Sequence, residues 1–367
     1  MRRGLISWSK EEVPDAAMAA RVTRTQELMR AQNFDAVIAY TSFARPSAVA
    51  WLTHFVPYWN DGLVVVFPQG LPLMLAAFSK RVEPWIREVS RVGDVIMTPN
   101  LGKGVVDMLK ERIPALAAGK AKIGMIERDE LPWPIAEAFD QGGLGAALVD
   151  FTVQYASLRQ PADASEIGLA QRALAIADKA FAAMPAGVKQ ASQLLTVIDS
   201  VARLDGAEEV HLKVAPDLAS DAALQRLEGD ARLGAQHAIG VSLGYKSVWV
   251  RTMRCLSAKP PASWAAAQAW FEQAVQKLNA ANIAKGPEAA GLAGRLGSWT
   301  VEACIAGAPL SIIAYGDATG QHSVRSLSDG ALAVLTVQAD LADGPWHGAA
   351  TVVLGQGGGK ARLLAAK

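Results

Sequence analysis

Aspartate is absent from a long stretch in the second half of this 367-residue sequence. None occurs from Ala231 to Gly316, and Glu302 is the last glutamate of the chain. A pair of divalent ions needs several carboxylates that bridge the metals and neutralise their charge. This stretch therefore contributes no aspartate to a site of that kind.

Cysteine, long apolar runs and excess charge are also scarce. The two cysteines, Cys255 and Cys304, match no metal-ligand spacing, which favours free thiols in a reducing cytoplasm. No run of about 18 apolar residues occurs, so we expect no membrane-spanning helix. The net charge is +1 without a basic stripe, which argues against nucleic acid and membranes as partners. Polar residues follow Met1-Arg-Arg where a signal peptide would be apolar, so we expect a cytoplasmic protein.

The hydrophobic fraction of 51% indicates a globular protein, and 367 residues allow two domains. In the first part of the chain, apolar strands alternate with amphipathic helices up to a last strand at 148–153, which is typical of an α/β domain. Ser157-Leu-Arg-Gln-Pro161 marks the boundary. We therefore predict domains at residues 1–156 and 157–367.

The second domain shows helices first and strands later. Asp163 or Ser165 is placed to cap a helix that runs to Met184. Gly244 is expected at the bend between two strands. The other predicted elements are helices at 192–204, 263–284 and 288–306 and strands at 310–314, 331–338 and 349–354.

Several short sequence motifs occur one after another along the chain. Trp51-Leu-Thr-His-Phe55 is close to a Tyr-Leu-Thr-Gly-Phe motif, and Leu158-Arg159 precedes a Glu-Ile helix. Gly229-Asp230, Gly244-Tyr245 and Arg251-Thr252 follow. On these residues the chain resembles the pita-bread family of creatinase, prolidase, aminopeptidase P and methionine aminopeptidase. The resemblance implies a creatinase-type α/β N-terminal domain and an α+β pita-bread C-terminal domain.

The resemblance also implies where metal ligands would lie: two Asp, one His and two Glu hold two ions in the peptidases of this family. Counted from Gly244-Tyr245, the Asp positions fall near His237 and at Val248. A shifted register places them at Gly240 or Val241 and at Arg251 or Thr252. The remaining ligand positions hold Gln338, Ala349 or Ala350, and the segment from Tyr315 to Gly320. We therefore expect neither metal nor cofactor.

These substitutions favour a metal-free protein without peptidase activity that binds a small ligand or a partner protein in the former active-site pocket. The alternative is a metal-free, creatinase-like hydrolase of a small amide or guanidino C–N bond. A working Xaa-Pro metallopeptidase is a third reading. His237, His211 and Glu302 are the catalytic candidates, with Glu208 or Glu209 orienting His211 unless this is a solvated charge cluster.

The pocket predicted from the resemblance combines residues of both domains. In dimeric relatives an N-terminal loop reaches the neighbour's active site, and the segment from Phe55 to Asn60 would otherwise be an exposed apolar patch. We therefore expect a homodimer, or an assembly with a paralogous subunit. His322 and His347 flank the C-terminal strands without a recognisable ligand spacing. The predicted pocket residues are His237, Tyr245, Trp249, Gln338, His54, Tyr58 and Trp59.

Overall fold

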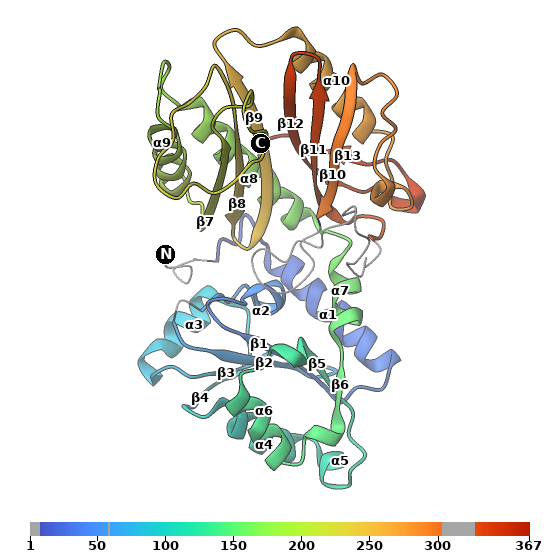
Figure 1. The fold of residues 1–367 in the computed structure, drawn as a ribbon. Coiled ribbons are helices and arrows are strands. Elements are labelled where there is room, and N and C mark those ends of the chain that lie inside the picture. Colours follow the sequence, from blue (N-terminus) through green and yellow to red (C-terminus); the bar gives the residue numbers. More distant parts are fainter. Residues whose placement is uncertain (1–7, 58, 303–326) are drawn as a thin grey trace. The chain divides into compact units, whose positions relative to one another are not determined.

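The computed structural model describes residues 8–57, 59–302 and 327–367 (Figure 1). The chain divides into two compact units between Arg159 and Gln160. Each unit has its own sheets and its own hydrophobic core.

The N-terminal unit is built on a six-stranded mixed sheet with strand order β4-β3-β2-β1-β5-β6. The pairs β1–β2 and β2–β3 are antiparallel, and the other neighbours are parallel. The strands are β1 (Ala36–Thr41), β2 (Gly62–Val66), β3 (Leu73–Ala76), β4 (Val95–Met97), β5 (Ile123–Ile126) and β6 (Leu148–Asp150).

Helices cover both faces of this sheet because its apolar side chains alternate between the faces. Val37 and Ala39 pack into one core, and Ala36 and Ile38 pack into the other. The first face is covered by α1 (Asp15–Ala31), α2 (Ser47–Thr53), α3 (Glu83–Val89) and α7 (Thr152–Arg159), and the second by α4 (Leu101–Arg112), α5 (Pro114–Ala117) and α6 (Trp133–Gln141).

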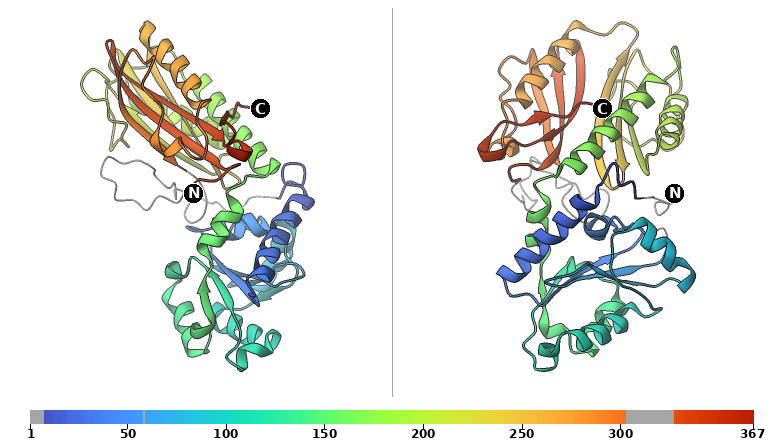
Figure 2. Two further views of the ribbon diagram at one scale, coloured as in Figure 1. Left: turned by 90° about the vertical axis from the view of Figure 1, so that its right-hand side faces the viewer. Right: turned by 180° about the vertical axis from the view of Figure 1, so that it is seen from behind.

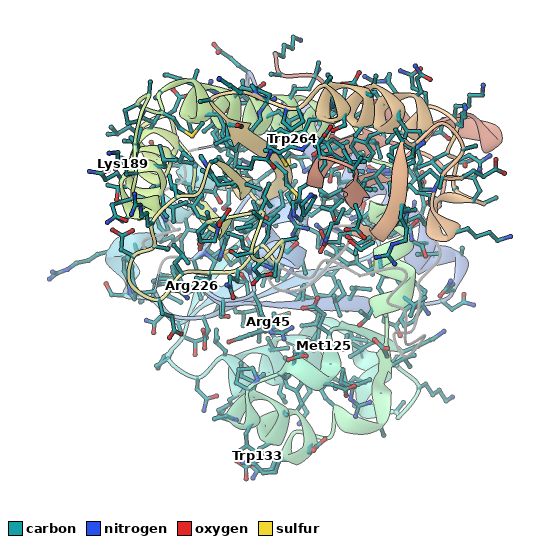
Figure 3. All side chains as sticks on the ribbon, turned by 45° about the horizontal axis from the view of Figure 1, so that its top comes forward. Arg45, Met125, Trp133, Lys189, Arg226 and Trp264 are labelled. Carbon is teal, nitrogen blue, oxygen red and sulfur yellow. The ribbon has the colours of Figure 1, made fainter. Side chains whose placement is uncertain are left out.

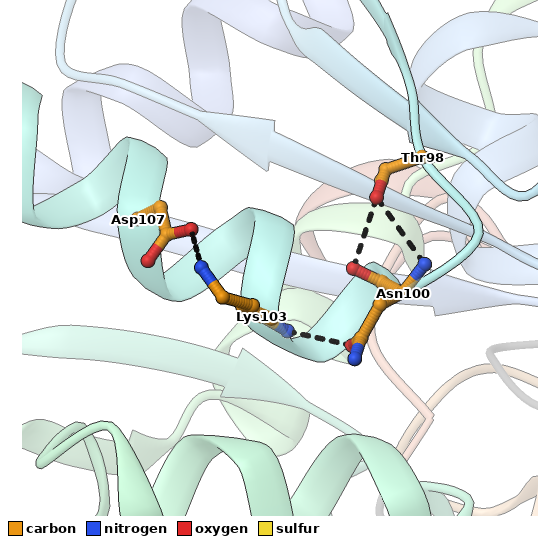
Figure 4. A network of polar contacts seen from close by, with 4 residues as sticks. All are labelled: Thr98, Asn100, Lys103 and Asp107. Carbon is orange, nitrogen blue, oxygen red and sulfur yellow. Dashed lines mark hydrogen bonds and ion pairs between the residues drawn. The ribbon is translucent and has the colours of Figure 1, made fainter.

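Two helix starts in this unit depend on short polar side chains. The Asn100 side chain accepts a hydrogen bond from the Lys103 backbone N–H at 3.0 Å and caps α4, and Lys103 pairs with Asp107 one turn later (Figure 4). Asp150 accepts from the Thr152 N–H at 2.9 Å. The strand predicted at 148–153 therefore ends at Asp150, and the chain turns into α7, which the sequence interpretation missed.

The C-terminal unit contains two antiparallel sheets, with orders β7-β8-β9 and β10-β11-β12-β13. The sheets lie next to each other at β9 and β12, where the His347 N–H points at the Cys255 Sγ, 3.2 Å away. The strands are β7 (Glu209–Ala215), β8 (Gln236–Tyr245), β9 (Val248–Ser257), β10 (Gly294–Glu302), β11 (Leu332–Leu341), β12 (Gly344–Val353) and β13 (Arg362–Leu363).

Three helices cover one face of these strands, called here the outer face (Figure 2). They are α8 (Ala164–Ala182), α9 (Ala191–Leu204) and α10 (Ala262–Val275). Val241 and Leu243 of β8 are fully buried in the core that α8 and α9 complete. Phe271 of α10 packs its ring edge-on against Trp299 and Trp346 at about 6 Å. The opposite, inner face is left for the site described below.

The capping prediction for α8 is confirmed: Asp163 and Glu166 form a reciprocal capping box. Other predictions were wrong. Part of the helix predicted at 288–306 is instead the strand β10, because its side chains alternate with period two between buried Trp299 and Val301 and the inner face. The helix predicted at 263–284 ends at Val275.

The bend between β8 and β9 lies at Lys246 and Ser247, both with positive φ, and not at Gly244. Gly244 pairs with Trp249 inside the ladder. β7 was not predicted at all. The strand predicted at 310–314 lies outside the described residues. None of the helices in the described ranges is long and apolar enough to cross a membrane.

Candidate functional site

A cavity of about 330 Å³ lies on the inner face of the C-terminal unit. Its walls come from both sheets, which meet at β9 and β12. Strands β7 to β12 each contribute side chains, because every second residue of a strand points to this face. The lining comprises Lys213, Leu224, Gly240, Ser242, Arg251, Met253, Ser298, Thr300, Glu302, Thr336, Val337, Gln338 and His347.

An ion pair between the two sheets stands in this cavity. The Arg251 Nη1 of β9 contacts the Glu302 Oε2 of β10, and the Arg251 Nε donates to the Ser242 Oγ at 2.8 Å. The two charged side chains are only 17% and 16% exposed. The guanidinium is therefore held in one orientation, by β8 on one side and by Glu302 on the other.

Burial raises the pKa of Glu302, and the charges of Arg251 and Lys213 offset part of that rise. Lys213 lies on β7, at the edge of its sheet, with an exposed side chain. Two cationic side chains thus face one carboxylate among the described residues of the lining. The cavity favours negative charge.

Neutral polar groups follow β10 and β11 along the other wall. Ser298 is paired with Gln338 and Thr300 with Thr336, and the two threonine hydroxyls contact each other. His347 of β12 is opposite Gln338, and its Nε2 lies 2.9 Å from the Ala222 carbonyl oxygen. Burial lowers the pKa of His347, so the ring is neutral at neutral pH.

Of the residues predicted from sequence, Glu302 and Gln338 line the cavity. His237 does not. It shares the parity of Ile239 and Val241, which points it to the outer face, whereas Gly240 and Ser242 point inward. Its Nδ1 lies 3.3 Å from the Gly234 carbonyl oxygen, and burial lowers its pKa.

Tyr245, Trp249 and His211 also lie outside the lining. Tyr245 packs into the helix-covered core of the outer face. Trp249 has inward parity, but its ring lies against Gly244 and His211, whose ring centre is 5.4 Å away. His211 lies within β7, and its Nε2 is 3.6 Å from Glu209. His211 lines a separate surface hollow between α9 and β7.

The N-terminal candidates belong to the other unit. His54 is buried at the end of α2 with a left-handed backbone, and its ring stacks on Trp8 at 6.4 Å. Phe55 is fully buried against Phe78 and Trp85, so it does not belong to an exposed patch as predicted. Trp59 is 42% exposed, and Tyr58 lies outside the described residues.

Sequence reasoning missed the residues that set the charge of the cavity. Arg251 and Thr252 were weighed only as substituted metal positions, and Lys213 was not considered. A signal existed: a two-residue turn at Lys246-Ser247 places Ser242 opposite Arg251. Period-two alternation then brings Gly240 to the same face as both.

The structure and part of the sequence match known proteins. Residues 21–160 match the family model of the Creatinase/Prolidase N-terminal domain. The prolidase from Pyrococcus horikoshii OT3 superposes with a TM-score of 0.65 at 15% identity, covering 94% of this chain and 97% of that one. No curated protein matches the sequence.

Two further solved structures agree. The Xaa-Pro dipeptidase from Bacillus anthracis has a TM-score of 0.65 at 14% identity, covering 95% of this chain and 98% of that chain. The X-Pro aminopeptidase from Thermotoga maritima MSB8 has a TM-score of 0.64 at 14% identity, covering 94% and 97%. The chain has the prolidase fold. A creatinase-type α/β domain precedes a pita-bread α+β domain, as the sequence predicted.

Two registers were considered for the metal-ligand positions on β8 and β9, and the shifted one agrees with the residues that line the cavity. Gly240 and Arg251 line it, whereas His237 and Val248 have outward parity. Among the described residues, no group of three or more His, Cys, Asp or Glu could hold a metal ion. A guanidinium inside the cavity repels divalent cations and occupies the nearby carboxylate. The described lining therefore does not fit a two-metal centre.

Proposed function

We propose that this protein is a relative of the Xaa-Pro peptidases without peptidase activity, which binds a small organic ligand in the pita-bread cavity without metal. A partner protein is the other occupant that the sequence left open. The cavity is of the size that small-molecule sites have, about 300–1,000 Å³. Its wall combines a few directed polar groups with the apolar side chains of Leu224 and Met253.

One observation carries this proposal: the Arg251–Glu302 pair occupies the inner face on which two ions would need several free carboxylates. Glu302 is the one carboxylate among the described lining residues, and it is already neutralised by Arg251. A neutral or anionic organic molecule meets no such electrostatic obstacle.

Elemental analysis and a peptidase assay test the proposal. The purified protein should hold no stoichiometric Mn, Co or Zn. It should release no proline from Xaa-Pro dipeptides when Mn²⁺ or Co²⁺ is added. One or two metal ions per chain together with metal-dependent cleavage would overturn the proposal.

A matched variant sharpens the assay. Gly240→Asp, Arg251→Asp and Gln338→Glu together add three carboxylates next to Glu302 and remove the guanidinium. The triple variant should bind Mn²⁺ measurably in calorimetry, and the parent should not. Equal binding by both proteins would show that the inner face does not determine metal affinity.

Metal-free hydrolysis of a small C–N bond is the second candidate, and the raised pKa of Glu302 favours it. A carboxyl group that titrates closer to neutral pH than usual is suited to proton transfer. Turnover of simple amides or guanidino compounds that Glu302→Gln abolishes would support it. This proposal uses Glu302 and neither His237 nor His211, since neither histidine lines the cavity.

Assembly is a separate proposal. We infer a homodimer from the likeness to dimeric relatives, or an assembly with a paralogous subunit. Trp59, 42% exposed at the surface of the N-terminal unit, is an exposed aromatic side chain of the segment from Phe55 to Asn60 and supports such a contact. Sedimentation at micromolar concentration should give a dimer mass, and a monomer mass would contradict the proposal.

A further inference from the structure

The charge of the cavity narrows the class of ligand. Lys213 and Arg251 carry two positive charges, and Glu302 carries one negative charge. A bound ligand with a single negative charge would balance the described lining. A cationic ligand would add to an existing excess of positive charge.

Hydrogen-bond donors in the cavity have capacity that the protein does not use. Within the described residues, Arg251 bonds through Nε and Nη1, which leaves Nη2 to donate. The Gln338 amide and the Ser298 hydroxyl face each other across β10 and β11 and can also donate. A planar carboxylate fits a guanidinium edge and such neighbouring donors.

The floor of the cavity is apolar and has room. Gly240 has no side chain, and the atoms nearest to a Cβ placed there belong to Leu224 and Met253, at 3.7 Å. A volume of about 330 Å³ holds about ten groups of the size of water. The floor therefore accepts a short hydrocarbon body.

We propose that the cavity binds a small organic monocarboxylate, whose carboxylate contacts Arg251 and Lys213 and whose short apolar body lies over Gly240, between Leu224 and Met253. The proposal rests on the proposed function of the same cavity and specifies its ligand. Glu302 competes with the ligand for Arg251, so it weakens binding and also offsets one of the two positive charges of the empty cavity.

Three probes of nearly equal shape test the charge: pentanoate, pentanamide and pentylamine. Their dissociation constants are measured by ligand-observed NMR titration at neutral pH and low salt. Pentanoate should bind at least about tenfold more tightly than pentanamide. Pentylamine should not bind, and the affinity for pentanoate should fall as salt is added.

Single variants should shift this affinity in opposite directions. Lys213→Gln should weaken pentanoate about two- to five-fold, because the lysine is exposed and screened. Glu302→Gln should strengthen it by removing the competing charge. Lys189→Gln is the matched control: it removes an exposed lysine before α9, outside the cavity, and should change nothing (Figure 3).

A double variant separates the contribution of the Arg251 guanidinium to binding from that of the remaining positive charge in the cavity. Arg251→Gln with Glu302→Gln keeps Lys213 but loses the planar donor, and should bind pentanoate about tenfold more weakly than Glu302→Gln alone. Circular dichroism and thermal unfolding confirm that each variant is folded before its affinity is interpreted.

Each contrary result has a distinct meaning. If pentanoate and pentanamide bind equally well and Glu302→Gln alters both affinities, the cavity is a binding site. The proposal that its ligand is an anion would then be wrong. Binding of pentanoate that none of the variants changes would place the anion elsewhere, and failure of all three probes to bind would also overturn the inference. The proposed function itself fails only in the separate metal and peptidase assays.

Discussion

Val241 and Ser242 are neighbours on β8, yet their side chains meet different surroundings. Val241 is fully buried in the core that α8 and α9 complete. Ser242 is half-buried on the inner face and accepts a hydrogen bond from Arg251. The same strand therefore has one face that packing fixes and another whose chemistry is free to differ.

This difference explains how a fold persists at 14–15% identity to prolidase structures. The outer face needs apolar side chains of suitable volume, and many sequences supply them. The inner face needs only polar groups that form hydrogen bonds or ion pairs with one another, as Arg251 and Glu302 do here. Fold and site are thus specified by different residues of the same strands.

The largest expected effect is on the outer face. Val241→Asp would bury a charge without a partner and should destabilise the protein by about 3–5 kcal/mol, measured by urea unfolding. Ser242→Asp adds the same charge one residue later, next to Arg251, and should change stability by less than about 1 kcal/mol. Similar losses in both variants would show that the faces do not differ.

A smaller effect is expected from breaking the inner ion pair. Arg251→Met leaves the Glu302 carboxylate half-buried without its partner and should cost about 1–3 kcal/mol at neutral pH. The loss should shrink as pH falls through the raised pKa of Glu302, because protonation removes the unpaired charge. Arg251→Met with Glu302→Met should recover most of the stability. If the double variant stays as unstable as the single one, the cost is lost packing and not lost charge.

The order of domains and most N-terminal elements could be predicted from the sequence because their apolar residues repeat with clear periods. The Asp163 cap is a local feature, and it was confirmed. β10 was taken for a helix because small residues before Arg295 hide the period of two that Trp299 and Val301 carry. The local composition there suggested a helix, whereas tertiary packing makes the segment a strand.

The site was harder to predict because it depends on register. In the structure, Gly240 and Ser242 of β8 point to the inner face. A register shift of one residue would place His237 and Val241 there instead. The sequence comparison allowed both registers, and only the ladder in the structure separates them. The pairing of Arg251 with Glu302 joins residues of two sheets, and no local pattern encodes it.

The pH dependence of ligand binding should be moderate and have a definite sign. Glu302 has a raised pKa, so it becomes neutral at a higher pH than an ordinary glutamate. Pentanoate affinity should therefore rise several-fold as pH falls through that pKa, until the probe itself protonates. Asp340 is paired with Arg295, and the lowered pKa of His347 delays its protonation. Glu302→Gln should remove the dependence, and a dependence that persists would assign it to another group.

The smallest effect is expected at Gly240, where one substitution should change both the stability of the protein and the space in the cavity. Glycine inside a strand is less stable than alanine, and a Cβ here meets neighbours at ordinary contact distance, 3.7 Å. Gly240→Ala should therefore stabilise the protein by about 0.4–1 kcal/mol in thermal unfolding. The added methyl group occupies the floor of the cavity, so pentanoate should bind more weakly at the same time. Higher stability with unchanged affinity would show that the ligand does not lie over Gly240. Lower stability would show that the floor has no room for a methyl group.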